Sequence, residues 1–198
     1  MRTFKAVILK ILGYCQIPRN FLWGYSHGIG FEASWRFFGL PWIRVGGARS
    51  SISIGRDFTA VSKLSRNSFG IIQKVMIRTV GSGAKIVIGD NVGVSGCTIT
   101  ACKSIQIGYR VLVGSGAVIV DYDAHPIHPG ERFNGGGAVA PVVIEDDVFV
   151  GARAIILKGV TIGRGSVVGA GAVVAKSIPP YSVAVGNPVR IIGDSRKG

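Results

Sequence analysis

The sequence predicts an all-β fold in which short parallel strands wind into a prism of stacked triangular coils. Three observations predict it: glycine supplies 30 of the 198 residues, aliphatic residues recur at every sixth position, and one segment rich in proline and glycine interrupts this regularity. Glycine at roughly twice its usual frequency indicates many tight turns. Since the glycines do not recur every third residue, a collagen helix is excluded. Charged residues make up only 17% of the chain, which excludes a disordered polyelectrolyte.

The six-residue period is clearest in the second half of the chain. Neither the period of a helix nor that of a half-exposed strand explains it, whereas a short strand followed by a tight turn does. Three such units form a coil of roughly 18 residues, so each aliphatic side chain points inward and is covered by its counterpart in the next coil. The predicted stacked pairs are Ile144 with Ile162, Val150 with Val168, and Ile156 with Val174.

The repeats extend toward the N-terminus with weaker regularity. Ile107, Val113 and Ile119 keep the spacing, and the first recognisable unit opens at Ile54-Gly55. The expected β-helix has roughly six coils and a height of about 28 Å. The predicted organisation is a basic and aromatic segment over 1–50, a repeat domain over 51–180, and a tail over 181–198.

The first residues combine an apolar stripe with basic residues. Within 1–14, apolar side chains follow helical spacing and Arg2, Lys5 and Lys10 lie mostly outside the stripe, which predicts a basic amphipathic helix. Two roles remain open: a cap or subunit contact at the open end of the apolar column, or peripheral contact with an anionic membrane. No apolar run is long enough to span a bilayer, and no cleavage site of a signal peptide follows. We therefore expect a cytoplasmic protein, which would be peripheral at the inner membrane face if the helix takes the second of these roles.

The charge of the chain is unevenly distributed. The net charge is +13, and residues 1–110 hold 15 basic and 3 acidic side chains. Nucleic-acid binding is disfavoured because the basic residues are spread along the repeats without interleaved aromatic residues. The three cysteines, Cys15, Cys97 and Cys102, are too few for a disulfide framework and do not complete a zinc site, so no metal is expected.

The regularity fails where the count from Ile107 in sixes reaches His125 instead of an aliphatic residue. The prolines and glycines of 126–143 predict a loop that leaves the prism, and such loops commonly build functional sites. Imidazole can accept a proton near neutral pH, so His125 is the candidate general base for acyl transfer. Asp121 and Asp123 are candidates for orienting the imidazole or contacting the acceptor, or else are solvated turn residues. His128 is expected to be an ordinary loop residue.

The repeats resemble the pattern of the hexapeptide-repeat acyltransferases, and Asp121-Tyr-Asp-Ala-His125-Pro resembles the active-site segment of galactoside and maltose acetyltransferases. This resemblance implies a left-handed parallel β-helix, whereas general chirality rules alone would predict right-handed crossovers. It further implies a homotrimer and acetyl-coenzyme A as cosubstrate. Carried over residue by residue, it implies a coenzyme A surface at Ala152, Ala170, Ala175, Lys176 and Arg190.

Two positions depart from the resembled family. Related enzymes often place an asparagine in the rung before the catalytic histidine, where this chain has Ser115 and Gly116. Phe149 replaces a tryptophan that is common in the sugar-modifying relatives. These departures concern the stabilisation of the developing oxyanion and the acceptor pocket.

The leading functional hypothesis is therefore an acetyl-coenzyme A-dependent acetyltransferase that acts on a hydroxyl or an amine of a sugar. Its acceptor is expected to be a sugar or a lipid- or nucleotide-linked glycan in the biosynthesis of surface polysaccharide or O-antigen. The alternatives are an acetyltransferase of a xenobiotic or a free sugar, and a β-helix that serves only as a scaffold or binding protein.

Overall fold

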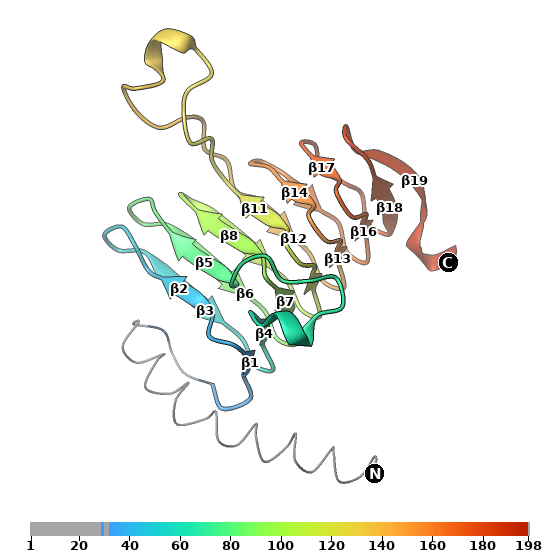
Figure 1. Ribbon diagram of the computed structural model, residues 1–198. Coiled ribbons are helices and arrows are strands. Elements are labelled where there is room, and N and C mark those ends of the chain that lie inside the picture. Colours follow the sequence, from blue (N-terminus) through green and yellow to red (C-terminus); the bar gives the residue numbers. More distant parts are fainter. Residues whose placement is uncertain (1–28, 30–31, 198) are drawn as a thin grey trace, which may run out of the picture.

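The chain is a left-handed parallel β-helix in the computed structural model, which describes residue 29 and residues 32–197 (Figure 1). Its strands form three sheets of 8, 6 and 5 strands, one on each face of the prism. Each turn of the chain contributes one strand to each sheet in succession, so neighbouring strands in a sheet belong to successive coils. The interior is a continuous column of buried aliphatic side chains.

The sheets are named here in the order in which the chain enters them. The first contains β1 (Arg36–Phe38), β4 (Thr59–Val61), β7 (Gly93–Ser95), β10 (Leu112–Val113), β13 (Phe149–Val150), β16 (Val167–Val168), β18 (Ser182–Val185) and β19 (Arg190–Asp194). The second contains β2 (Trp42–Arg44), β5 (Met76–Thr79), β8 (Thr98–Ala101), β11 (Val118–Val120), β14 (Ile155–Ile156) and β17 (Val173–Val174). The third contains β3 (Ser51–Ile54), β6 (Lys85–Ile88), β9 (Ser104–Ile107), β12 (Val142–Ile144) and β15 (Thr161–Ile162). Short 3-10 helices span Leu64–Arg66, Pro129–Glu131 and Ser195–Lys197.

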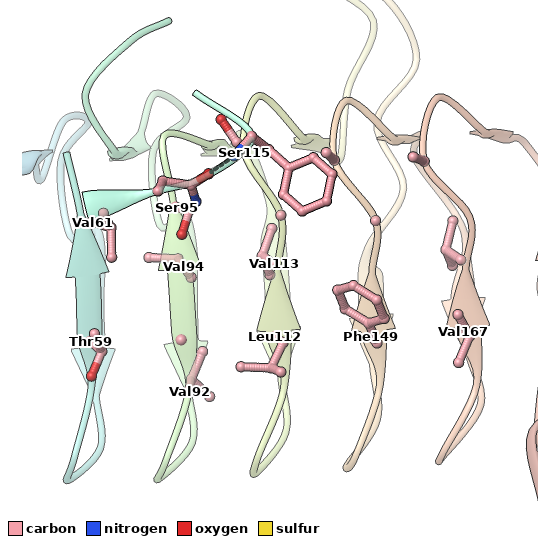
Figure 2. A pocket seen from close by; sticks show the side chains of 18 of the residues that line it. Thr59, Val61, Val92, Val94, Ser95, Leu112, Val113, Ser115, Phe149 and Val167 are labelled. Atoms are coloured by element: carbon pink, nitrogen blue, oxygen red, sulfur yellow. Dashed lines mark hydrogen bonds between the residues drawn. The ribbon is translucent and has the colours of Figure 1, made fainter. Parts of the chain in front are cut away.

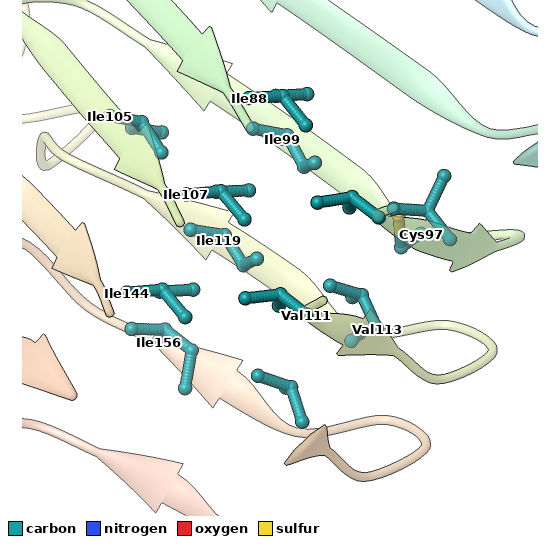
Figure 3. Close-up of a cluster of buried hydrophobic side chains, with 14 of the residues drawn as sticks. Ile88, Cys97, Ile99, Ile105, Ile107, Val111, Val113, Ile119, Ile144 and Ile156 are labelled. Atoms are coloured by element: carbon teal, nitrogen blue, oxygen red, sulfur yellow. The ribbon is translucent and has the colours of Figure 1, made fainter. Parts of the chain in front are cut away.

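The predicted stacking is confirmed in register. Ile144 pairs with Ile162, Val150 with Val168, and Ile156 with Val174. Figure 3 shows the same ladders of inward-pointing side chains continuing into earlier coils, such as Ile88, Ile107 and Ile144. Burying each side chain against its counterpart contributes about 25 cal/mol per Å² of apolar surface, and no single coil could obtain this alone.

The coils begin earlier than residue 51, which was the expected start of the repeat domain. β1 pairs with β4 and β2 pairs with β5, so the first coil already opens at Arg36. Aromatic side chains fill its interior in place of aliphatic ones: Trp35, Phe37 and Phe58 are buried and contact one another. Because these core residues are aromatic, the six-residue pattern of aliphatic residues does not reveal the first coil. The predicted helix over 1–14, its capping or membrane role, His27 and Cys15 lie outside the described residues.

Two loops leave the prism within the described chain, where only one was expected. Residues 121–141 join β11 to β12 and protrude beyond the coils (yellow in Figure 1). Residues 62–75 join β4 to β5 and were not foreseen. The Val75 N–H donates to Ser62 Oγ, and Gln73 Nε2 donates to Thr98 Oγ1, and these hydrogen bonds hold the second loop on the corner between the first and second sheets.

The cysteines of the described chain belong to the coils. Cys97 is fully buried, and this burial raises the pKa of its thiol to about 12, so the thiol is inert as a nucleophile. Cys102 is half-buried, and both residues are free thiols. Within the described part of the chain, none of the helices has the length and apolar character required to cross a membrane.

Candidate active site

The loop that carries His125 is closed at its base by a short antiparallel pairing. Tyr122 forms a bridge with Val139, and the Asp123 N–H donates to the carbonyl of Ala138 (2.9 Å). Gly137 lies where the two arms meet, because a Cβ at this position would stand 2.5 Å from both the Asp123 Cβ and the His125 carbonyl oxygen. The absence of a side chain therefore allows the two arms to approach, and this places His125 just beyond the closed base.

Asp121 anchors the loop from inside the prism. Its side chain is buried, and its carboxylate accepts backbone N–H groups of Cys102 (2.6 Å), Lys103 (2.7 Å) and Ser104 (2.6 Å) in the preceding coil. Cys102 and Lys103 form the turn between β8 and β9, and Ser104 begins β9. Both carboxylate oxygens of Asp121 thus accept from backbone groups, and Asp121 forms no hydrogen bond with the His125 imidazole in this structure.

Asp123 ties the loop to the following coil. The Lys158 Nζ lies 2.8 Å from Asp123 Oδ1 and 2.7 Å from Oδ2. Asp123 is thus not hydrogen-bonded to the imidazole either, and it is no free solvated acid. It positions the loop through an ion pair that the sequence did not suggest, because Lys158 follows it only after the whole loop and a further coil.

His125 itself is oriented by a backbone carbonyl. Its Nδ1 lies 3.0 Å from the carbonyl oxygen of Arg132, and its side chain is exposed. A carbonyl oxygen only accepts, so this contact keeps the proton on Nδ1 and leaves the lone pair on Nε2. A neutral imidazole in this tautomer is able to remove a proton from a hydroxyl group that approaches Nε2. His128, in the same loop, is exposed and has no polar contact with His125.

A groove of about 720 Å³ runs along the outer face of the first sheet. Figure 2 shows Leu112, Phe149 and Val167 following one another on successive strands of this groove. Near the corner with the second sheet, the groove reaches Ser115, whose hydroxyl donates to the Gly70 carbonyl of the unforeseen loop. Ser115, noted above as a departure from the resembled enzymes, therefore fixes this loop and lies on a different corner of the prism from His125 of the same chain.

A smaller hollow of about 430 Å³ lies at that corner. Ala152 and Ala170 line both it and the larger groove. Successive coils approach each other closely at this corner, since a Cβ on Gly151 would stand 2.6 Å from the Ala170 backbone nitrogen. The small side chains keep the edge of the prism open, and such an edge fits an extended, largely apolar chain such as the pantetheine arm of coenzyme A.

The remaining predicted coenzyme A residues divide between two corners. Arg190 opens β19 and pairs with Val185 at the end of β18, which places it on the same corner as Ala152 and Ala170. Ala175 and Lys176 follow β17 and are exposed on the corner between the second and third sheets, from which the His125 loop also leaves. Within one chain, His125 lines neither hollow.

Comparison with known proteins agrees with this architecture. A family model described as "Hexapeptide repeat of succinyl-transferase" matches residues 141–176. The galactoside O-acetyltransferase of Escherichia coli (strain K12) is 40% identical over 111 residues, which are 56% of this chain and 54% of that protein. The crystal structure of a polysialic acid O-acetyltransferase superposes with a TM-score of 0.59 and 25% identity over 84% of each chain. The repeats and the fold of the chain resemble those of the hexapeptide-repeat acetyltransferases.

Another curated relative matches a shorter part of the chain. The 2,3,4,5-tetrahydropyridine-2,6-dicarboxylate N-acetyltransferase of Staphylococcus aureus (strain JH9) is 40% identical over 85 residues, 43% of this chain and 31% of that protein. The chain thus spans about half the length of the galactoside enzyme and about a third of the staphylococcal one. The loop over 62–75 contains aliphatic residues such as Leu64 and Ile71, but they do not keep the six-residue spacing, and this break was the only sequence signal of the loop.

Proposed function

We propose that the chain catalyses acetyl transfer from acetyl-coenzyme A to a hydroxyl group of a sugar, with His125 as the general base. The observation that carries this proposal is the contact between His125 Nδ1 and the Arg132 carbonyl (3.0 Å), which leaves Nε2 ready to accept a proton. The galactoside and polysialic acid enzymes that resemble this chain are both O-acetyltransferases by name. An amine acceptor would use the same base.

The reaction needs no covalent intermediate on the protein. His125 Nε2 accepts the proton as the hydroxyl oxygen forms its bond to the acetyl carbon, and the imidazolium returns that proton to the sulfur as the carbon–sulfur bond breaks. The thioester supplies the activated acetyl group. Ala152 and Ala170 would line the path of the pantetheine arm, and Lys176 and Arg190 would bind its phosphates. Most of the remaining rate would come from holding thioester and acceptor together.

A complete site requires a second copy of the chain, and we propose the homotrimer that the family resemblance implies. His125 and Lys176 belong to one corner of the prism, whereas Ala152, Ala170 and Arg190 belong to another. Prisms packed side by side would bring these two corners together. Two large apolar side chains of the His125 loop support this arrangement, because Ile127 is 83% and Phe133 is 98% exposed in the isolated chain.

The acceptor is proposed to be a glycan in the assembly of a surface polysaccharide. The polysialic acid O-acetyltransferase supports this class, since it covers most of this chain and has a similar fold. The basic, apolar pattern of residues 1–14 supports peripheral contact with an anionic membrane at the cytoplasmic face, where basic residues near the surface contribute about 1 kcal/mol each. Liposome co-sedimentation of the full chain and of a chain lacking 1–14, with and without anionic lipid, tests this contact. Binding that ignores lipid charge would exclude it.

The activity itself is tested by thiol release from acetyl-coenzyme A. The full chain is assayed against free sugars, nucleotide sugars and oligosaccharides, and the product is analysed by mass spectrometry for an added acetyl group and its position. We expect acceptor-dependent release that requires His125. Thiol release that is independent of every acceptor, or transfer that survives without His125, would contradict the proposed mechanism.

A further inference from the structure

Two arginines stand opposite each other on the outer face of the second sheet. In the pairing of β2 with β5, Arg44 lies opposite Arg78. Arg44 is exposed and Arg78 is half-buried. Like charges directly opposite each other on neighbouring strands destabilise a sheet. A negatively charged group next to the two arginines would remove this repulsion.

The described chain offers no such counter-charge. Neither guanidinium has a hydrogen bond or an ion pair with any described residue, and the buried Nε of Arg78 has no hydrogen-bond partner. Leaving a buried donor unpaired is costly. Two other arginines of the coils do have a carboxylate partner, since Arg56 pairs with Asp90 and Arg110 with Asp147. The unpaired arginines therefore mark a place where an acceptor group from outside the described chain fits.

Trp42 lies beside the two arginines, and the three residues are called the Trp42 cluster here. Trp42 adds an aromatic ring that can contact a ligand. The guanidinium carbon of Arg78 lies 5.9 Å from the centroid of the Trp42 ring, and Trp42 is 38% exposed. Trp42 and Arg44 both point outward because the buried Ile43 lies between them on β2. An indole ring packs well against the apolar face of a sugar ring, and guanidinium groups bind carboxylate or phosphate oxygens through two parallel hydrogen bonds.

Arg44 and Arg78 lie in one row of paired residues across the second sheet, and this row leads to the first residues of the His125 loop. Arg78 pairs with Thr100, and Thr100 pairs with Val120, the last residue before that loop. Parallel strands are about 4.8 Å apart, so Arg78 lies roughly 10 Å and Arg44 roughly 14 Å along the sheet from Val120. A single sugar ring does not bridge such a span, whereas an oligosaccharide does.

We propose that Trp42, Arg44 and Arg78 form a subsite for an anionic group of an oligosaccharide acceptor. The group is the carboxylate of an acidic sugar or the phosphate of a phosphodiester-linked glycan, and it lies apart from the hydroxyl that receives the acetyl group. This inference rests on the proposed function and adds to it the chemical class of the acceptor. It also accounts for part of the positive charge of the first 110 residues.

The first test is a binding measurement that does not depend on transfer. Isothermal titration calorimetry of the full chain uses three probes of similar length: an oligosialic acid for the carboxylate, a glycerol-phosphate oligomer for the phosphodiester, and a neutral maltooligosaccharide. We expect at least one anionic probe to bind about tenfold or more tightly than the neutral one, and to weaken with added salt. The stronger of the two anionic probes identifies the source of the charge. Equal binding of all three probes would overturn the proposal.

The second test removes the guanidinium groups one at a time. Arg44→Gln and Arg78→Gln should each weaken binding of the anionic probe about tenfold and leave the neutral probe unchanged. Lys85→Gln is the matched control, because Lys85 is an exposed cation of the same coil on the third sheet, and the change removes the same charge. Arg78→Lys should restore only part of the binding, since an ammonium lacks the planar fork. If Lys85→Gln weakens binding as much as Arg78→Gln, the effect is general charge and the subsite does not exist.

Transfer assays separate failure of this inference from failure of the proposed function. In Arg78→Gln, the KM for an anionic acceptor should rise while the KM for acetyl-coenzyme A stays constant. Rapid transfer to neutral sugars alone, unaffected by Arg78→Gln, would overturn the anionic subsite and leave the acetyltransferase activity standing. Analytical ultracentrifugation of each variant is expected to match the parent. Loss of assembly in Arg78→Gln would instead assign the arginines to a contact between copies and would overturn the subsite.

Discussion

The Nζ of Lys158 lies 2.7 Å from Oδ2 of Asp123, and this ion pair joins the root of the His125 loop to the coil that follows it. Since the loop leaves the prism at one corner, its orientation depends on the few contacts at its base. The buried carboxylate of Asp121 holds the preceding coil, Gly137 lets the two arms meet, and Lys158 holds the next coil. The candidate base is thus positioned by residues that do not touch it.

Breaking this ion pair should affect transfer more than folding. Both side chains are more than a quarter exposed (28% and 29%), so Lys158→Met or Asp123→Asn is expected to cost only about 0–1 kcal/mol of unfolding free energy. Displacement of His125 should lower kcat roughly 10- to 100-fold. In a double-mutant cycle, the combined variant should lose no more than either single one. Arg110→Gln, which breaks an ion pair with Asp147 elsewhere, is the control. Additive losses would show that the two residues act separately.

Replacement of His125 should abolish most of the activity and leave the protein intact. The imidazole is exposed and contributes nothing to the apolar column, so His125→Ala should unfold at the parent temperature. Loss of a general base should lower the transfer rate about 10²- to 10⁴-fold. His128→Ala, a change in the same loop, should retain nearly the parent rate. Transfer by His125→Ala within tenfold of the parent would remove this residue from the base role.

Asp121 should behave as a stabilising residue. Asp121→Ala leaves three backbone N–H groups without their acceptor, and the expected loss is on the order of 3 kcal/mol in unfolding free energy, measured by urea denaturation. Asp121→Asn keeps one acceptor oxygen and should lose less. Activity corrected for the folded fraction should fall only as far as the loop is displaced. A variant of parent stability with selectively abolished transfer would restore the catalytic role suggested by the sequence.

Lys176 and Arg190 should act on the cosubstrate. Lys176→Ala or Arg190→Ala is expected to raise the apparent KM for acetyl-coenzyme A more than the KM for the acceptor, because phosphate contacts contribute to binding rather than proton transfer. Dephospho-coenzyme A as the acetyl carrier sharpens the test. The residue that binds the 3′-phosphate should show no further loss with this analogue. Unchanged KM values in both variants would place the cosubstrate elsewhere.

The repeat and its register were predictable because they depend on local chemistry. Ile144, Val150 and Ile156 stand six residues apart, and their partners stand one coil further on, so the period alone dictates which side chains stack. His125 was predictable for the same reason, as it occupies a position where the period requires an aliphatic residue. The first coil escaped prediction because Phe37 and Phe58 fill it with aromatic rings.

The sequence by itself thus determined the fold class, the stacked core and the loop that carries the candidate base. Only the tertiary structure decided the roles of Asp121 and Asp123, the presence of the loop over 62–75, and the unpaired arginines on the second sheet. The physical reason is distance along the chain. A β-helix places residues about one coil apart in direct contact, so Asp121 meets Lys103 and Asp123 meets Lys158. A hydrophobic period indicates which side chains point into the core. It does not indicate which polar side chains form hydrogen bonds or ion pairs between coils.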